Sequence, residues 1–170
     1  MADAALHLTD LPACTRLILR GRAPATRAVA APLGFALPLQ SCRAVTAGDR
    51  SALWLGPDEW LILARASDSI APALAQAMQG CPHSLVDVSH RQCGIELSGG
   101  VAADALNAGC PLDLAEAAFP IGMCTRTVLA KSEVVLWRVS PGTFRLEVAR
   151  SFVPYVRAFL HEAARGYPGR

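Results

Sequence analysis

The densest group of side chains that could do chemistry lies in Asp87-Val88-Ser89-His90-Arg91. A serine beside a histidine carries the groups of a nucleophile and its base, but adjacent residues of a strand point to opposite faces. The sequence has no Gly-x-Ser-x-Gly turn and no glycine-rich phosphate loop after a strand. We therefore expect no catalytic residue in this chain. Asp87 and Ser89 should bind nearby backbone at a strand bend, with His90 and Arg91 facing solvent or a partner.

Four potential zinc ligands surround the same segment: Cys81, His83, His90 and Cys93. Structural zinc sites usually take paired ligands from tight turns. Here a predicted strand at Ser84–Val88 would carry the two pairs to opposite ends, so no metal site is expected. The six cysteines include no Cys-x-x-Cys pair, and in a reducing compartment we expect free thiols packed as small apolar groups.

Aromatic and charged residues on predicted strands and loops are candidates for contact with a partner. The tryptophans are expected in the core, and any exposed one would anchor an interface. Asp113 and Glu116 are the acids of a central loop, which we expect to be either the start of a helix or a contact loop. No partner in the sequence suits either acid for acid–base catalysis. The interface candidates are Trp54, Trp60, His90, Arg91, Asp113, Phe119 and Arg126.

The composition favours a chain with hidden protein–protein surface. Of the 170 residues, 52% are hydrophobic and 18% charged, against roughly 25% charged in a typical soluble domain. An alanine-rich sequence would inflate the apolar count in the same way. No apolar run approaches the roughly 20 residues that cross a bilayer, and the scattered basic residues (net charge +2) form no nucleic-acid footprint. Residues 1–10 do not resemble a secretory signal, so we expect a cytoplasmic protein.

The positions of these residues follow from a pattern that occurs twice. Leu53-Trp54, a turn over 56–59 and an apolar run from Trp60 are matched by Leu136-Trp137, a turn over 140–143 and an alternating run from Phe144. Each copy predicts strand, turn and strand, followed by a helix. A repeat of about half the chain predicts a single domain, 1–170, with internal duplication at about 14–80 and 84–165.

Both halves are expected to contain a strand, a helix, three strands and a helix, which predicts an α+β fold. The first half should have strands at 16–20, 43–46, 51–55 and 60–64, with helices at 24–33 and 70–79. The second should have strands at 84–88, 93–97, 123–129, 134–139 and 144–148, with helices at 101–108 and 152–164. The predicted caps are Asp68 or Ser69, Ser98 and Ser151, and the apolar stripe of the last helix is Phe152, Tyr155, Val156, Phe159 and Leu160.

Two resemblances connect these motifs to known families. The segments 87–90, 95–99, 102–106, 134–138 and 144–148 resemble the glycine-cleavage aminomethyltransferase, or T-protein. More specifically, the whole chain resembles the gamma subunit of heterotetrameric sarcosine oxidase, in segments 55–60, 87–92, 109–114, 119–127, 135–138 and 150–152.

The resemblance implies the fold of the folate-binding aminomethyltransferase domain. It also implies a non-catalytic structural subunit that holds alpha, beta and delta subunits together. The complex oxidises sarcosine to glycine, with hydrogen peroxide and methylenetetrahydrofolate or formaldehyde as further products. In that family FAD, FMN, NAD and tetrahydrofolate are associated with the alpha and beta subunits and zinc with delta, and the gamma subunit binds no cofactor. One alternative is a folate-binding domain with contacts from Asp87, Ser89, His90 and Arg91, and another is a transient assembly factor.

Overall fold

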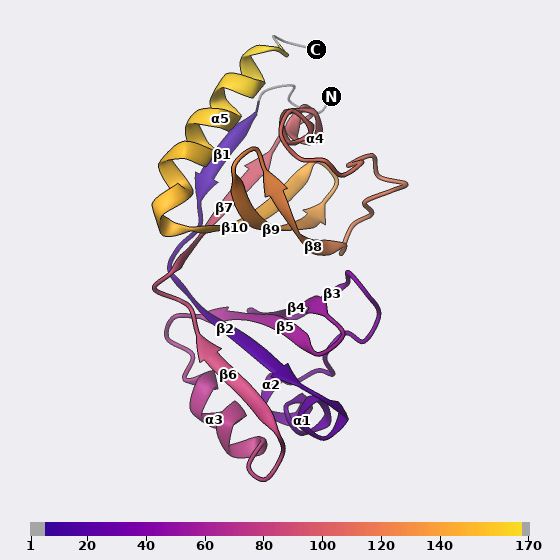
Figure 1. Ribbon diagram of the computed structural model, residues 1–170, viewed down its shortest axis with the longest axis vertical. Coiled ribbons are helices and arrows are strands. Elements are labelled where there is room, and N and C mark those ends of the chain that lie inside the picture. Colours follow the sequence, from indigo (N-terminus) through magenta and orange to yellow (C-terminus); the bar gives the residue numbers. More distant parts are fainter. Residues whose placement is uncertain (1–5, 168–170) are drawn as a thin grey trace. The chain divides into compact units, whose positions relative to one another are not determined.

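The computed structural model describes residues 6–167 and places them in two compact units (Figure 1). The first unit comprises residues 13–90. The second unit combines the described residues up to Pro12 with those from Arg91 onward. The chain thus passes from one unit to the other twice, and the first unit is nested in the sequence of the second.

The first unit is a five-stranded antiparallel sheet with helices on one face (Figure 1). Its sheet order is β3-β4-β5-β2-β6. The elements are β2 (Cys14–Gly21), α1 (Ala23–Ala28), α2 (Ala30–Leu33), β3 (Ala44–Ala47), β4 (Arg50–Gly56), β5 (Glu59–Arg65), α3 (Ile70–Ala77) and β6 (His83–Asp87). Alternate residues of the strands pack with the helices into one core that contains Leu17, Leu19, Trp60, Ile62 and Leu74.

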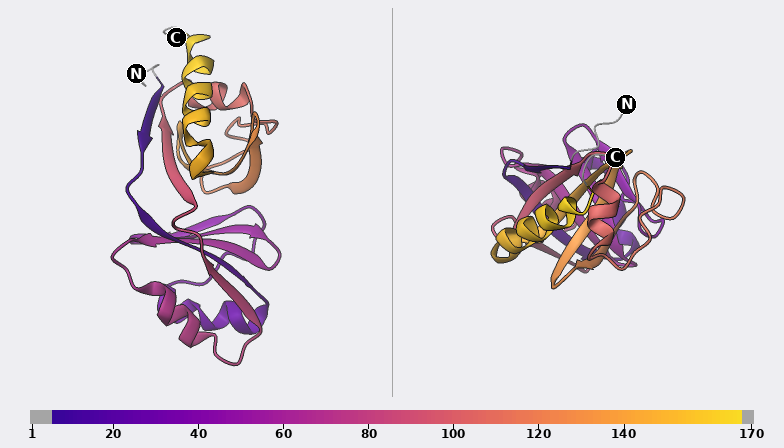
Figure 2. Two further views of the ribbon diagram at one scale, coloured as in Figure 1. Left: turned by 60° about the vertical axis from the view of Figure 1, so that its left-hand side comes forward. Right: turned by 90° about the horizontal axis from the view of Figure 1, so that it is seen from above.

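The second unit has the same architecture. Its sheet order is β1-β7-β10-β9-β8, all antiparallel. The elements are β1 (His7–Asp10), β7 (Gln92–Ser98), α4 (Ala102–Asn107), β8 (Cys124–Leu129), β9 (Ser132–Ser140), β10 (Thr143–Ala149), the 3₁₀ turn η1 (Arg150–Phe152) and α5 (Val153–Arg165). Figure 2 shows α4 and α5 beside each other along the sheet, and both contribute to one core with Ile95, Phe144 and Leu146.

Backbone hydrogen bonds show that the two units are equivalent position by position. Gly21 N–H donates to Asp58 O over 3.0 Å in the first unit, and Gly99 N–H donates to Gly142 O over 3.2 Å in the second. Further into the same sheets, Trp54 N–H donates to Arg43 O and Arg138 N–H to Met123 O, both over 3.0 Å. The predicted turns at 56–59 and 140–143 are therefore equivalent, and Trp60 corresponds to Phe144, since each follows the first residue of its strand. The Leu-Trp motifs before these turns are offset by one residue, because Trp54 corresponds to Arg138 and not to Trp137.

The edge strands differ from the predicted division of the chain. The sequence pattern predicts residues 84–88 in the second half, but β6 pairs with β2 in the first unit, from Leu17 opposite Asp87 to Gly21 opposite His83. The strand β1, which we did not predict, takes the corresponding place in the second unit, with His7 opposite Ser98. Local alternation shows that a segment is extended, whereas the choice of sheet depends on partners far away in the sequence.

The helix predicted at 24–33 is divided in two. Pro32 lacks an N–H and its ring collides with the carbonyl of residue 28, and α1 accordingly ends at Ala28 before α2 begins at Ala30. Gly34 ends α2 as predicted, with φ at +85°, a conformation that glycine adopts without steric cost.

The predicted side-chain caps were wrong. Val101 and Phe152 are the N-cap residues of α4 and α5, not Ser98 and Ser151. Ser69 does precede α3, but its side chain makes no capping hydrogen bond. The stripe of α5 is also narrower than predicted. Val156 and Leu160 are fully buried, whereas Phe152 and Tyr155 are 42% and 38% exposed. Phe152 lies in η1 and does not follow the period of the α-helix.

Asp68 is engaged by Arg50 instead of capping α3. The guanidinium Nε and Nη2 of Arg50 donate to the two carboxylate oxygens over 2.7 and 3.1 Å, and Nη1 donates to Pro32 O over 2.6 Å. This pair therefore ties β4 to the end of α2 and the start of α3. The hydrogen bond from Arg50 lowers the pKa of Asp68 below 3.8, and the bond and the charge of Asp68 raise the pKa of Arg50.

Replacing Asp68 with asparagine is expected to remove a pH-dependent part of the stability. A carboxylate whose pKa is lowered in the folded state stabilises the fold at pH values above its ordinary pKa of 3.8. That contribution is lost as the pH falls through the folded pKa. Urea unfolding from pH 7 to pH 3 should show D68N less stable than the wild type at neutral pH, with the difference shrinking below about pH 4. D49N, at an exposed pair with Arg65, is the matched control, and an unchanged difference for D68N down to pH 3 would contradict the assignment.

Candidate functional site

The polar segment 87–91 forms the bend that was predicted. Asp87 ends β6, and its Oδ1 accepts a hydrogen bond from Ser89 N–H over 2.8 Å. Ser89 Oγ accepts one from Arg16 N–H, also over 2.8 Å. Both side chains therefore bind nearby backbone, as expected. The hydroxyl and amide of Ser89 lower the pKa of Asp87, which keeps it ionised and makes it a weak general base.

His90 and Arg91 are exposed, as predicted, and fall on opposite sides of the boundary between the units. In the second unit Arg91 lines a cavity of about 160 Å³ with Arg126, Gln92, Glu133 and Glu147. The structure thereby brings together Arg91 and Arg126, two interface candidates that the sequence did not connect. Gln92 Oε1 is buried there without a hydrogen-bond partner among the described residues.

Two of the interface candidates lie in hydrophobic cores. Trp60 is 1% exposed and its indole N–H donates to Pro38 O over 2.8 Å. Phe119 is also 1% exposed, with its ring centroid 6.5 Å from that of Phe144. Neither offers surface to a partner in this conformation, because each fills the space between its sheet and the loop that covers it. Trp54 is half-buried beside the core of the first unit.

The remaining candidates lie on the surface of the second unit. Asp113 is exposed, and its Oδ1 accepts a hydrogen bond from Ala115 N–H over 2.9 Å, so its carboxylate organises the loop. Arg126 is exposed on β8, which lies at the edge of the sheet and, within residues 6–167, pairs with β9 alone. Two exposed apolar side chains flank it, Ile121 at 45% and Val128 at 41%.

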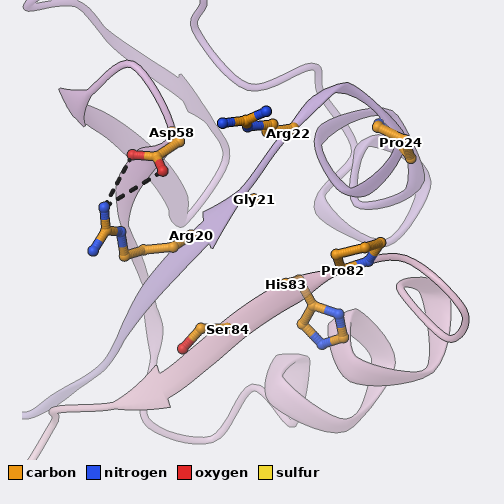
Figure 3. A pocket seen from close by; sticks show the side chains of 8 residues that line it. All are labelled: Arg20, Gly21, Arg22, Pro24, Asp58, Pro82, His83 and Ser84. Atoms are coloured by element: carbon orange, nitrogen blue, oxygen red, sulfur yellow. Dashed lines mark hydrogen bonds and ion pairs between the residues drawn. The ribbon is translucent and has the colours of Figure 1, made fainter.

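A larger pocket, of about 550 Å³, lies in the first unit where β2 ends and β6 begins (Figure 3). The turn between β4 and β5 and the start of α1 complete its walls, and its lining includes Arg20, Arg22, Pro24, Asp58, Pro82 and His83. Arg20 Nη2 donates to Asp58 Oδ1 and Oδ2 over 3.2 and 3.4 Å. We did not predict this site, since its residues come from three separate segments.

His83 has a defined tautomer in this pocket. Its Nδ1 lies 2.7 Å from Cys81 O. A carbonyl oxygen only accepts, so Nδ1 carries the proton and Nε2 holds the lone pair of the neutral ring. This contact also joins two of the four potential metal ligands around β6. Cys81 and His83 meet through a backbone carbonyl, and β6 separates them in the chain from His90 and Cys93.

The described part of the chain, residues 6–167, has no group of three or more histidine, cysteine or acidic side chains placed to hold a metal ion. All six cysteines are free thiols, as predicted. Within the same residues, none of the helices has the length and apolarity needed to span a bilayer.

Comparison with solved structures identifies the class of fold. The glycine cleavage system aminomethyltransferase T from Bartonella henselae matches 96% of this chain and 50% of its own, with a TM-score of 0.73 and 13% identity. At that identity the likeness shows a shared fold, an α+β architecture resembling the folate-binding aminomethyltransferase domain. This confirms the predicted fold class.

The family follows from closer matches. A chain of the heterotetrameric sarcosine oxidase from Corynebacterium sp. U-96, in complex with pyrrole 2-carboxylate, matches all of this chain and 89% of its own, with a TM-score of 0.92 and 28% identity. The sequence model of the sarcosine oxidase gamma subunit family matches residues 20–166. This chain belongs to that family, as its motifs predicted.

Curated relatives from three sources carry the name sarcosine oxidase subunit gamma, and two of them are compared with this chain as follows. The relative from Corynebacterium sp. (strain U-96) is 32% identical over 166 residues, which cover 95% of this chain and 80% of the relative. The relative from Arthrobacter sp is 40% identical over 112 residues, which cover 65% of this chain. That alignment spans 55% of the length of the Arthrobacter protein.

Proposed function

We propose that this chain is the non-catalytic, structural gamma subunit of a heterotetrameric sarcosine oxidase. The observation that carries the proposal is the match of the whole chain, at a TM-score of 0.92, to a chain of such a complex. The partners would be alpha, beta and delta subunits. The complex would oxidise sarcosine to glycine with formation of hydrogen peroxide, and would transfer the one-carbon unit to tetrahydrofolate or release it as formaldehyde. FAD, FMN, NAD, tetrahydrofolate and zinc would reside on the other subunits.

The edge strand β8 is the part of the second unit that best supports a contact with a partner. Exposed edges with apolar side chains tend to aggregate unless another chain covers them. Here Ile121 and Val128 are both more than 40% exposed, on either side of the charged Arg126. Trp54, His90, Arg91 and Asp113 remain further proposed contacts. A large, partly apolar interface is typical of permanent complexes, which bury roughly 2,000 Å² or more.

Affinity purification tests this assignment. The chain, tagged and co-expressed with its neighbouring subunits, should recover a yellow complex that contains a large subunit and a flavin-bearing subunit. V128D, which places a charge on the β8 edge, should lower that recovery at least about tenfold. L39D is the matched control, because Leu39 is 75% exposed in the first unit and should tolerate the charge. A colourless chain without partners would overturn the proposal, and equal recovery with V128D would exclude β8 as the contact.

The shared fold with an aminomethyltransferase is the observation that favours a second candidate, a folate-binding domain. Two of the four polar groups suspected of binding folate are engaged elsewhere, since Asp87 accepts a hydrogen bond from Ser89 N–H and Ser89 Oγ accepts one from Arg16 N–H. The other two, His90 and Arg91, are exposed. Calorimetric titration of the isolated chain with tetrahydrofolate separates the candidates. The structural role predicts no heat of binding, whereas a saturable signal that is lost in D87N would establish the folate site.

A further inference from the structure

We propose that the pocket at the end of β2 in the first unit binds a small organic anion, with Arg22 and His83 as its polar contacts. The ligand class is a carboxylate or phosphate attached to a compact apolar body. The inference goes beyond the role as a structural subunit and does not depend on it, because every residue of the pocket belongs to residues 13–90.

The pocket has one more arginine than it has acids to pair with, so one positive charge is available to a ligand. Among the described residues of the lining, Asp58 is the only acid, and it is already paired with Arg20 over 3.2 Å. Within residues 6–167, Arg22 makes no side-chain hydrogen bond or ion pair and is exposed. Figure 3 draws bonds from Asp58 to Arg20 and none to Arg22, with His83 at the start of β6 and Pro82 directly before that strand. An unpaired guanidinium in a concave site favours anionic oxygen atoms, which it can bind through two parallel N–H groups.

The second unit provides an internal comparison for this arrangement. The equivalent strand end also forms a pocket, of about 510 Å³, lined by His7, Ser98, Gly99, Gly100, Pro141, Gly142 and Thr143. Among the residues that the structure describes, this lining contains no arginine and no acid. The register makes Ser98 equivalent to Arg20 and Gly142 equivalent to Asp58. The fold therefore forms this strand end without arginines, so the charges in the first unit are not required for folding.

The shape and the remaining walls restrict the ligand. A volume of about 550 Å³ is in the range of pockets that hold small organic molecules, roughly 300–1,000 Å³. Pro24 and Pro82 provide apolar wall next to the basic groups. With Nδ1 bound to Cys81 O, the Nε2 atom of His83 donates to an anionic oxygen only when the ring is protonated, because the neutral ring presents a lone pair there. These features fit a ring or short chain that carries one anionic group, more closely than an inorganic ion.

Titration of the full chain by calorimetry tests the proposal with simple probes. Benzoate and phenyl phosphate carry the anionic group on an apolar ring, whereas benzyl alcohol has the ring without the charge. We expect saturable binding of at least one anion and none of the alcohol. Which anion binds more tightly distinguishes a carboxylate from a phosphate ligand.

Matched variants locate the binding. R22Q should weaken it at least about tenfold, the loss expected for a charged hydrogen bond of about 1.4 kcal/mol or more, and H83Q should weaken it as well. R27Q, on the exposed side of α1, removes the same charge outside the pocket and should leave the affinity unchanged. Circular dichroism confirms that each variant folds, and R22K provides a milder variant if R22Q does not. Absence of binding by both anions, or equal loss in R22Q and R27Q, would overturn the proposal.

Discussion

Replacing Trp60 with alanine is expected to lower the free energy of unfolding by about 4 kcal/mol, the usual cost of deleting a large buried aromatic side chain. The ring is 1% exposed at the centre of the first unit. Its indole N–H also holds the loop after α2 through Pro38 O. The variant therefore loses packing and leaves a buried carbonyl without its donor. Urea unfolding followed by circular dichroism measures the change.

Trp60→Phe separates the two losses. Phenylalanine keeps much of the ring and removes the donor, so we expect a cost of about 2 kcal/mol. Hydrogen exchange should place the loss of protection in residues 13–90, where all neighbours of Trp60 in its core cluster lie. If Trp60→Ala lowers the free energy of unfolding by less than about 1 kcal/mol, the side chain of Trp60 is not packed in a continuous core.

The equivalent substitution in the second unit, Phe144→Ala, should also cost about 4 kcal/mol. Phe144 is fully buried, and the guanidinium of Arg138 lies 4.6 Å from the centre of its ring. Arg138 is only 4% exposed. Its Nη2 donates to Leu114 O over 3.0 Å, but Nε and Nη1 have no hydrogen-bond partner in the described chain. The ring is therefore a main source of compensation for a buried cation.

A double-mutant cycle with F144L and R138M isolates that interaction. Leucine and methionine preserve most of the buried volume and remove the aromatic face and the charge in turn. We expect a coupling free energy of about 1–2 kcal/mol, as for a desolvated cation–π pair. A coupling near zero would mean that Arg138 is held by its bond to Leu114 alone. Guanidinium unfolding of the four proteins provides the measurement.

Much of the fold could be predicted from the sequence because its signals are local. The apolar alternation from Phe144 to Val148 and the turns at 56–59 and 140–143 define strands wherever the chain lies, and both meanders are found as expected. The assignment of β6 and the existence of β1 could not be predicted in this way. Both are edge strands, whose place is set by pairing with β2 and β7.

The site was predicted where the interactions are local and missed where they are not. The bond between Asp87 and Ser89 spans two residues and follows from turn chemistry. Asp68 was expected to cap α3, because nothing in the nearby sequence shows that Arg50 would compete for its carboxylate. The pocket of Arg20, Arg22 and His83 likewise forms only when β2 and β6 pair. The one sequence signal that could have indicated it is the pair of arginines on either side of Gly21.

The nesting of one unit within the other has a consequence for biosynthesis. Every strand and helix of the first unit is present once residue 90 has been added to the growing chain. In contrast, β1 precedes the first unit in the chain and has no partner until β7 is translated. The order of translation therefore makes the first unit complete before the second, while β1 stays unpaired. Factors that bind nascent chains would meet β1 as an open strand throughout that interval.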